Sequence, residues 1–253
     1  MRRSSFSFSL YVSITWSLLA AAFLFSGCSS ADKKADTAEG AYSIAQEYDK
    51  DERYEEALRR YQDVKNKYPY SKYATMSELA VADVYFKQES FAESQVAYQS
   101  FKDLHPKHPQ IDYVTYRLAM SYYNQLPSTI DRDLTLATSA ILFFDEVIRQ
   151  FPTSQHVSES KEKKESALKM LAEKEQYIAE FYYKREKYDS ALNRFDGLLR
   201  KYSGLGLDAN ALSKAAISSA KIGDMDRARK YLNELNSRFP GSSEANNAAK
   251  EVK

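Results

Sequence analysis

Small, apolar and aromatic residues recur at fixed intervals along this chain, against a polar background. The first set begins at residue 44 and ends in a proline: Ile44, Ala45, Tyr48, Ala57, Tyr61, Val64 and Pro69. The second set follows 37 residues later: Val81, Ala82, Tyr85, Ser94, Tyr98, Phe101 and Pro106. Each set predicts a pair of helices joined by a short turn.

Three further sets follow in the same order. The third is Leu118, Ala119, Tyr122, then Ala140, Phe144, Val147 and Pro152, whose second half arrives nine residues late. The fourth is Ile178, Ala179, Tyr182, Ala191, Phe195 and Leu198, with Ser203 where a proline is expected. The fifth is Ala215, Ala216, Ser219, Ala228, Leu232, Leu235 and Pro240. Small residues let paired helices approach closely, aromatic residues fill the gap beside them, and proline stops the second helix because it lacks an N–H.

This pattern resembles the tetratricopeptide repeat, a helix-turn-helix unit of about 34 residues. The resemblance predicts an all-α protein with five tetratricopeptide-like helix-turn-helix repeats stacked as a superhelical solenoid. With 7 Gly and 6 Pro in 253 residues, the composition also favours helices. Each unit of such an array packs only on its neighbours.

Two segments interrupt the regular spacing and suggest how the array is divided. Residues 124–134, with Pro127 and Asp131, predict a loop inserted between the helices of the third repeat. Residues 158–186 contain no Pro or Gly and predict one long helix. We therefore expect repeats 1–3 over residues 38–155, and the connecting helix with repeats 4–5 over residues 156–253.

The N-terminus predicts targeting rather than fold. Arg2 and Arg3 precede an apolar run, and Cys28 follows it as the only cysteine. This arrangement resembles a bacterial lipoprotein signal, although Phe25 replaces the usual Leu, and an ordinary secretory signal is the alternative. The resemblance implies a signal peptide over 1–27, acylation of Cys28, a polar tether over 28–37, and, with Ser29 in second place, anchoring at the outer membrane of a diderm bacterium, facing the periplasm.

Charge and candidate chemistry narrow the function. Beyond Arg2 and Arg3 the chain has 34 basic and 35 acidic side chains, so nothing favours nucleic-acid binding, which needs clustered positive charge. The pair His105 and His108 has no third ligand nearby, which argues against a metal site. Since we find no nucleophile motif and no glycine-rich phosphate loop, we expect no cofactor and no enzymatic activity.

In tetratricopeptide arrays, the second, fifth, ninth and twelfth positions of each first helix line the concave face. In the first three repeats these positions hold many aromatic and apolar residues: Tyr42, Met76, Leu79, Phe86, Tyr113, Tyr116, Met120 and Tyr123. A groove of this kind predicts an extended peptide ligand with aromatic or apolar side chains. The same positions of the fourth repeat, with Glu173, Gln176 and Glu180, are acidic and polar, so we expect the two halves to bind different partners.

Local matches point to one family. HPKHPQIDYVTYR, the Asp131-Arg132-Asp133 insertion, RQFPTSQHV and KEQYIAEFYYKREKYDSALNR resemble the BamD (ComL) family of β-barrel assembly lipoproteins, over residues Ala41 to Arg229. The resemblance implies a lipid-anchored scaffold, working with other assembly lipoproteins. Its C-terminal repeats would dock a BamA-like barrel protein, with Arg194 and the insertion as candidate contacts. Its N-terminal groove would receive unfolded outer-membrane proteins.

A second interpretation fits the signal and the repeats equally well. A tetratricopeptide lipoprotein of the cell envelope could instead organise peptidoglycan synthesis, division or pilus assembly. The Asp-Arg-Asp insertion and the HPKHPQIDYV stretch favour the assembly interpretation.

The lipid anchor gives a direct test. Cys28→Ser should remove metabolic labelling by a palmitate analogue, because no other cysteine can receive the thioether-linked lipid. Ser30→Ala, which keeps the cysteine, should label normally. Unchanged labelling of Cys28→Ser would place the anchor elsewhere.

Overall fold

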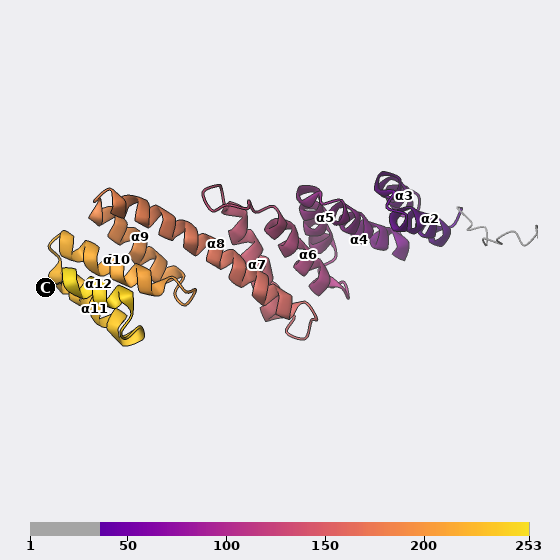
Figure 1. The fold of residues 1–253 in the computed structure, drawn as a ribbon. Helices are drawn as coiled ribbons and strands as arrows, with labels where there is room; N and C mark the ends of the chain where they lie inside the picture. The colour runs from indigo at the N-terminus through magenta and orange to yellow at the C-terminus, as the bar shows by residue number, and fades with distance from the viewer. Residues whose placement is uncertain (1–35, 253) are drawn as a thin grey trace, which may run out of the picture. The chain divides into compact units, whose positions relative to one another are not determined.

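The computed structural model describes residues 36–252, and every regular element in that range is an α-helix (Figure 1). The predicted signal peptide, the acylation site Cys28 and most of the predicted tether lie outside the described residues. None of the described helices is both long enough and apolar enough to cross a membrane.

The chain divides into two compact units, and the division falls within helix α4 (Lys72–Lys87), between Ala74 and Thr75. The first unit contains α2 (Ala38–Lys50) and α3 (Tyr54–Lys67), which pack on each other. This division lies in the second repeat rather than at residue 155. The boundary that we expect between repeats 1–3 and repeats 4–5 stays a prediction.

In the second unit, helices that are neighbours in the chain pack side by side from α5 to α12. They are α5 (Phe91–Leu104), α6 (Ile111–Asn124), α7 (Thr135–Gln150), α8 (Val157–Lys184), α9 (Tyr188–Lys201), α10 (Asp208–Lys221), α11 (Met225–Arg238) and α12 (Ser243–Glu251). The first helices of successive repeats also touch, α6 on α8 and α8 on α10. The 28-residue α8 covers the segment for which one long helix is expected, except Arg185 and Glu186, which lie in the turn that follows it.

The small residues of the repeat signature are all buried, which allows the two helices of one repeat to approach closely. All ten are 0% exposed: Ala45, Ala57, Ala82, Ser94, Ala119, Ala140, Ala179, Ala191, Ala216 and Ala228. Beside them Tyr61, Tyr98, Phe144 and Phe195 are also buried. A larger side chain at a small position would overpack the core and cost about 1–3 kcal/mol.

A common turn joins the two helices in four of the repeats. One turn residue has a left-handed backbone, with φ of 58° at Glu52, 59° at Glu89, 56° at Glu186 and 84° at Gly223. The next N–H donates to a carbonyl five residues earlier, as from Ser90 to Tyr85 (3.0 Å). This bond belongs to the Schellman motif, which usually has glycine in the left-handed position. Here glutamate takes that position three times, at a cost of about 1–2 kcal/mol each.

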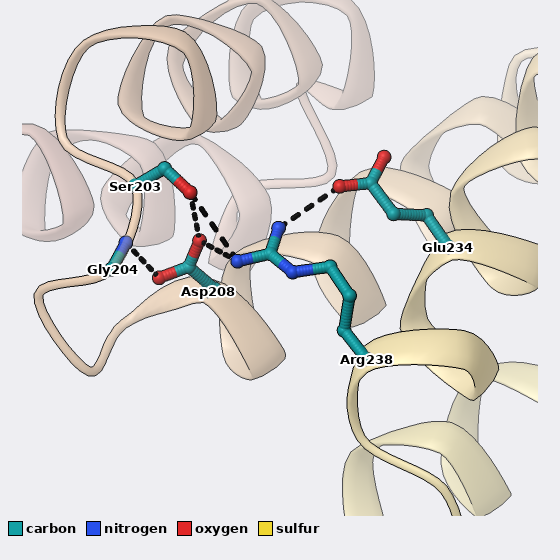
Figure 2. A network of polar contacts seen from close by, with 5 residues as sticks. All are labelled: Ser203, Gly204, Asp208, Glu234 and Arg238. Carbon is teal, nitrogen blue, oxygen red and sulfur yellow. Dashed lines mark hydrogen bonds and ion pairs between the residues drawn. The ribbon is translucent and has the colours of Figure 1, made fainter.

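The turn between repeats 4 and 5 lacks the usual proline and has a polar network instead (Figure 2). Asp208, the first residue of α10, is 2% exposed. Its Oδ1 accepts hydrogen bonds from Ser203 Oγ (2.7 Å) and Arg238 Nη2 (2.6 Å), and its Oδ2 accepts one from Gly204 N (2.8 Å). Arg238 also pairs with Glu234 (2.9 Å). The network fixes the chain between α9 and α10 and ties it to the end of α11.

Two opposing effects set the acidity of Asp208. Burial disfavours the ionised form, but the Ser203 hydroxyl, the Gly204 amide and the Arg238 guanidinium together hold the pKa of the carboxyl below its usual value. A depressed folded-state pKa means that ionised Asp208 stabilises the fold. This stabilisation is complete above the unfolded-state pKa of about 3.9 and is lost as the pH falls through the folded-state pKa.

Asp208→Asn should lower the free energy of unfolding at pH 7 by about 1.5–3 kcal/mol, because it removes the negative charge that accepts three hydrogen bonds. The difference from the original protein should shrink below about pH 4, because the unfolded chain then takes up a proton at Asp208 before the folded protein does. Urea unfolding between pH 7 and pH 3 measures both effects. Glu234→Gln, at an exposed pair, should change stability by less than about 1 kcal/mol. A difference that stays constant down to pH 3 would contradict the role given to the charge.

Candidate functional site

The residues predicted to line the concave groove differ sharply in burial, and the difference follows their place in the repeat. The fifth-position residues Tyr42, Leu79 and Tyr116 are 7–9% exposed. Met76, at a second position, is 39% exposed. The other second, ninth and twelfth positions among the predicted residues are half-buried: Phe86, Tyr113, Met120 and Tyr123. The fifth position therefore contributes to the core, and the other three positions provide the surface.

In the first unit, Tyr42 packs between two other tyrosines. Its ring centroid lies 5.6 Å from those of both Tyr61 and Tyr73. Gln46 donates a hydrogen bond to the Tyr42 hydroxyl (3.4 Å). Aromatic contacts of this kind add to the stabilisation from burial alone, so Tyr42 orders the interior of this unit.

In the second unit, the groove residues of α4 and α6 belong to two adjoining cores. Leu79 packs with Phe86 and Tyr113 around Leu118. Tyr116 packs with Met120 and Tyr123. The structure thus brings the predicted residues together in two groups, and each group leaves aromatic or thioether surface partly exposed.

A half-buried carboxylate connects α4, α5 and α6. Asp83 Oδ1 accepts hydrogen bonds from the hydroxyls of Tyr98 (2.5 Å) and Tyr113 (2.7 Å). Burial raises the pKa of Asp83, although both tyrosine hydroxyls oppose the shift. Burial, together with the neighbouring Asp83, raises the pKa of Tyr113 to about 12. The tyrosines therefore stay protonated and act as hydrogen-bond donors at neutral pH.

Arg117 joins the same surface. Its guanidinium carbon lies 3.7 Å from the ring centroid of Phe86 and 5.6 Å from that of Tyr113. Its Nε is buried and has no hydrogen-bond partner among the residues that the structure describes. This cation and the half-buried rings make the surface of α4 and α6 aromatic and polar rather than purely apolar.

The repeat pattern did not single out His156, which lies in the turn before α8. Its ring stacks on Tyr116 with centroids 4.4 Å apart and planes 9° from parallel. It also lies 5.7 Å from the ring of Tyr113. Spacing within repeats could not reveal this contact, because His156 lies in a turn between repeats and meets a helix of the preceding one.

The inserted loop, residues 125–134, is attached to α8 by apolar and polar contacts. Leu126 and Leu134 pack with Ala167 and Met170 of that helix. Lys174 of α8 donates a hydrogen bond to the carbonyl of Arg132. The loop is therefore held in one place on the surface.

The three charged residues of the loop, predicted as docking contacts, are all exposed. Asp133 Oδ1 accepts from the backbone N of Thr135 (2.9 Å) and from its hydroxyl (2.6 Å) at the start of α7. The Thr135 hydroxyl lowers the pKa of Asp133, and the Thr129 hydroxyl lowers that of Asp131. Asp133 thus has a local structural role, while the side chains of Asp131 and Arg132 face solvent.

Arg194 of α9, the other predicted docking residue, is also exposed. Its Nη1 lies 3.1 Å from Glu175 Oε2 on α8. An exposed pair of this kind contributes about 0–1 kcal/mol to stability, so the guanidinium can exchange this carboxylate for another at little cost.

The predicted absence of a metal site can be examined in the part of the chain that the structure describes. There, no three His, Cys, Asp or Glu side chains are grouped so as to hold a metal ion. His105 instead pairs with Glu78 (2.6 Å), and both His105 and His108 contact the ring of Phe101.

Comparisons with known proteins agree with the resemblance. The model of a family described as outer membrane lipoprotein, YfiO, matches residues 34–221, and a tetratricopeptide repeat model matches residues 210–242. The outer membrane protein assembly factor BamD of Neisseria meningitidis serogroup A is 26% identical over 213 residues, which cover 81% of this chain and 80% of that protein. BamD of Rickettsia prowazekii is 27% identical over 231 residues, which cover 89% and 90%. Among solved structures, the TPR2AB domain of yeast Sti1 in complex with pHSP90 is 12% identical, with 82% and 80% coverage and a TM-score of 0.42.

Proposed function

The chain belongs to the YfiO family of outer membrane lipoproteins, and we propose that it acts as a non-enzymatic scaffold in the assembly of outer-membrane β-barrel proteins. The observation that carries the proposal is the row of partly exposed aromatic and methionine side chains on α4 and α6. Exposed charged residues, Asp131, Arg132 and Arg194, lie elsewhere in the second unit. The proposal draws further support from the BamD relatives, whose similarity extends over most of both chains.

The groove of α4 and α6 would receive segments of unfolded outer-membrane proteins. Phe86, Tyr113, Met120 and Tyr123 are each anchored on one side in a core, so they need little ordering when a ligand binds. Rigid aromatic residues and adaptable methionines are typical of surfaces that bind varied apolar segments. Arg117, stacked on Phe86, adds a positive charge beside them.

The C-terminal repeats would dock a BamA-like barrel protein and other assembly lipoproteins. Arg194 would exchange Glu175 for an acidic group of the partner, and Asp131 and Arg132 would add exposed charges at the inserted loop. Charges at the rim of an interface mainly speed association and set its orientation.

Acylation of Cys28 would confine the scaffold to the periplasmic face of the outer membrane. Two or more acyl chains anchor a protein stably. Confinement raises the effective concentration of the repeats near a membrane-embedded partner. Binding and positioning suffice for this role, and it requires no cofactor.

The groove proposal predicts the effect of shortening two methionines. Met76→Ala with Met120→Ala should weaken the binding of a ten-residue peptide of alternating apolar residues that ends in phenylalanine. The expected loss is about tenfold, or ~1.4 kcal/mol. Fluorescence anisotropy on the full chain in detergent measures the affinity, and thermal unfolding checks the fold. Val96→Ala, an exposed truncation on α5 outside the groove, should leave binding unchanged. Equal affinity in the double variant and the Val96 variant would contradict the groove.

The docking proposal predicts opposite outcomes for the two members of one ion pair. Arg194→Ala should slow association with a detergent-solubilised BamA-like barrel protein by about three- to tenfold, since steering charges act on the association rate. Glu175→Gln removes the competing carboxylate but keeps Arg194, so association should be unchanged or faster. Surface plasmon resonance at two salt concentrations measures both. If the two variants slow association equally, the pair matters for local structure and not for docking.

A further inference from the structure

A pocket lies where the inserted loop meets the middle of α8. It has a volume of about 270 Å³ and is lined by Ile130, Glu173, Gln176, Tyr177 and Glu180. The hydrogen bond from Lys174 to the Arg132 carbonyl holds the loop against the helix beside it. Four lining residues come from about two turns of one helix, and Ile130 is supplied by the insertion.

The polar lining of the pocket calls for a hydrogen-bond donor with positive charge. Glu173 and Glu180 contribute two carboxylates. Gln176 donates its amide nitrogen to Glu180 Oε1 (3.3 Å) and to Asn210 Oδ1 (3.5 Å), which fixes the orientation of the amide. The Oε1 of Gln176 is buried and, among the described residues, has no donor.

Within the described part of the chain, the cation closest to these carboxylates is only weakly placed. Lys184 Nζ lies 3.9 Å from Glu180 Oε2 and its side chain is 75% exposed. A pair at this distance and exposure contributes little and is readily exchanged. Lys174, one residue after Glu173, is occupied by the loop carbonyl.

The rim of the pocket is aromatic. Tyr177 is 56% exposed and Phe181, one turn further along α8, is 43% exposed. Arg185 already places its guanidinium 3.6 Å from the centroid of the Phe181 ring. The surface therefore holds one arginine on an aromatic face, which is the contact that a second arginine could make with Tyr177.

We infer that this pocket binds an arginine side chain presented by a partner protein. The apolar stem would lie on Ile130 and Tyr177, and the guanidinium would meet Glu173 and Glu180. Arginine suits the site better than lysine because its planar group offers five donors and stacks on aromatic rings. The inference rests on the proposed scaffold role only in taking the ligand from a protein partner.

The test uses no partner protein, so it can fail while the scaffold role stands. The full chain in detergent micelles carries ¹³C-methyl isoleucine, and Ile130 is assigned with the Ile130→Leu variant. The probes are Nα-acetyl-arginine amide, its neutral citrulline analogue, and free L-arginine. We expect a saturable shift of the Ile130 methyl signal with the blocked arginine and at least fivefold weaker binding of citrulline. The signal of Ile222, an exposed residue outside the pocket, should not move.

Paired carboxylate variants complete the test. Glu173→Gln with Glu180→Gln should weaken the blocked arginine at least fivefold. Glu162→Gln with Glu165→Gln, at exposed positions of the same helix outside the pocket, should leave its binding unchanged. Equal binding of arginine and citrulline, or equal effects of the two double variants, would overturn the arginine site. Tighter binding of free L-arginine than of the blocked form would overturn the assignment to a protein side chain.

Discussion

Close approach of two helices at a pair of small residues is the constraint on which the rest of this structure depends. One such pair lies in every repeat, and all ten side chains are fully buried. Where the helices are this close, the large ring of Tyr61, Tyr98, Phe144 or Phe195 can fill the space beside the contact. Tight packing of this kind tolerates little change in volume. It fixes which faces of each helix remain outside, and both the half-buried aromatic residues of α4 and α6 and the α8 pocket lie on those faces.

Polar contacts complete the structure at places where the repeat pattern is incomplete. Ser203 stands where the other repeats have a proline. Hydrogen bonds from Ser203 and Arg238 to the buried Asp208 order that turn instead. The insertion in the third repeat leaves a long loop, and Leu126, Leu134 and Lys174 attach it to α8. These contacts leave the regular repeats unchanged. They also create the surface features that distinguish one repeat from another.

The sequence predicted the fold well because its signal is local and repeated. The buried alanines and aromatic residues recur at fixed spacing, so one helix pair could be recognised five times. The site was harder to predict. Leu79 and Tyr116 occupy positions expected to line a groove, yet neighbouring helices cover them. Asp83 with Tyr98 and Tyr113, and His156 on Tyr116, join residues from different repeats. Contacts between repeats depend on helix packing angles, which spacing within a repeat does not determine.

The glutamate and glycine turns bear on how such an array can change in length. In repeats 4 and 5 the left-handed residues Glu186 and Gly223 stand 37 positions apart, as do the small contact residues on either side of them. A duplication of 37 codons in this region would therefore copy a whole turn, a whole helix pair and both of its packing faces. The new unit would meet its neighbours through surfaces that already fit. The number of repeats can therefore change by one duplication at a time, and the packing inside the existing repeats need not change.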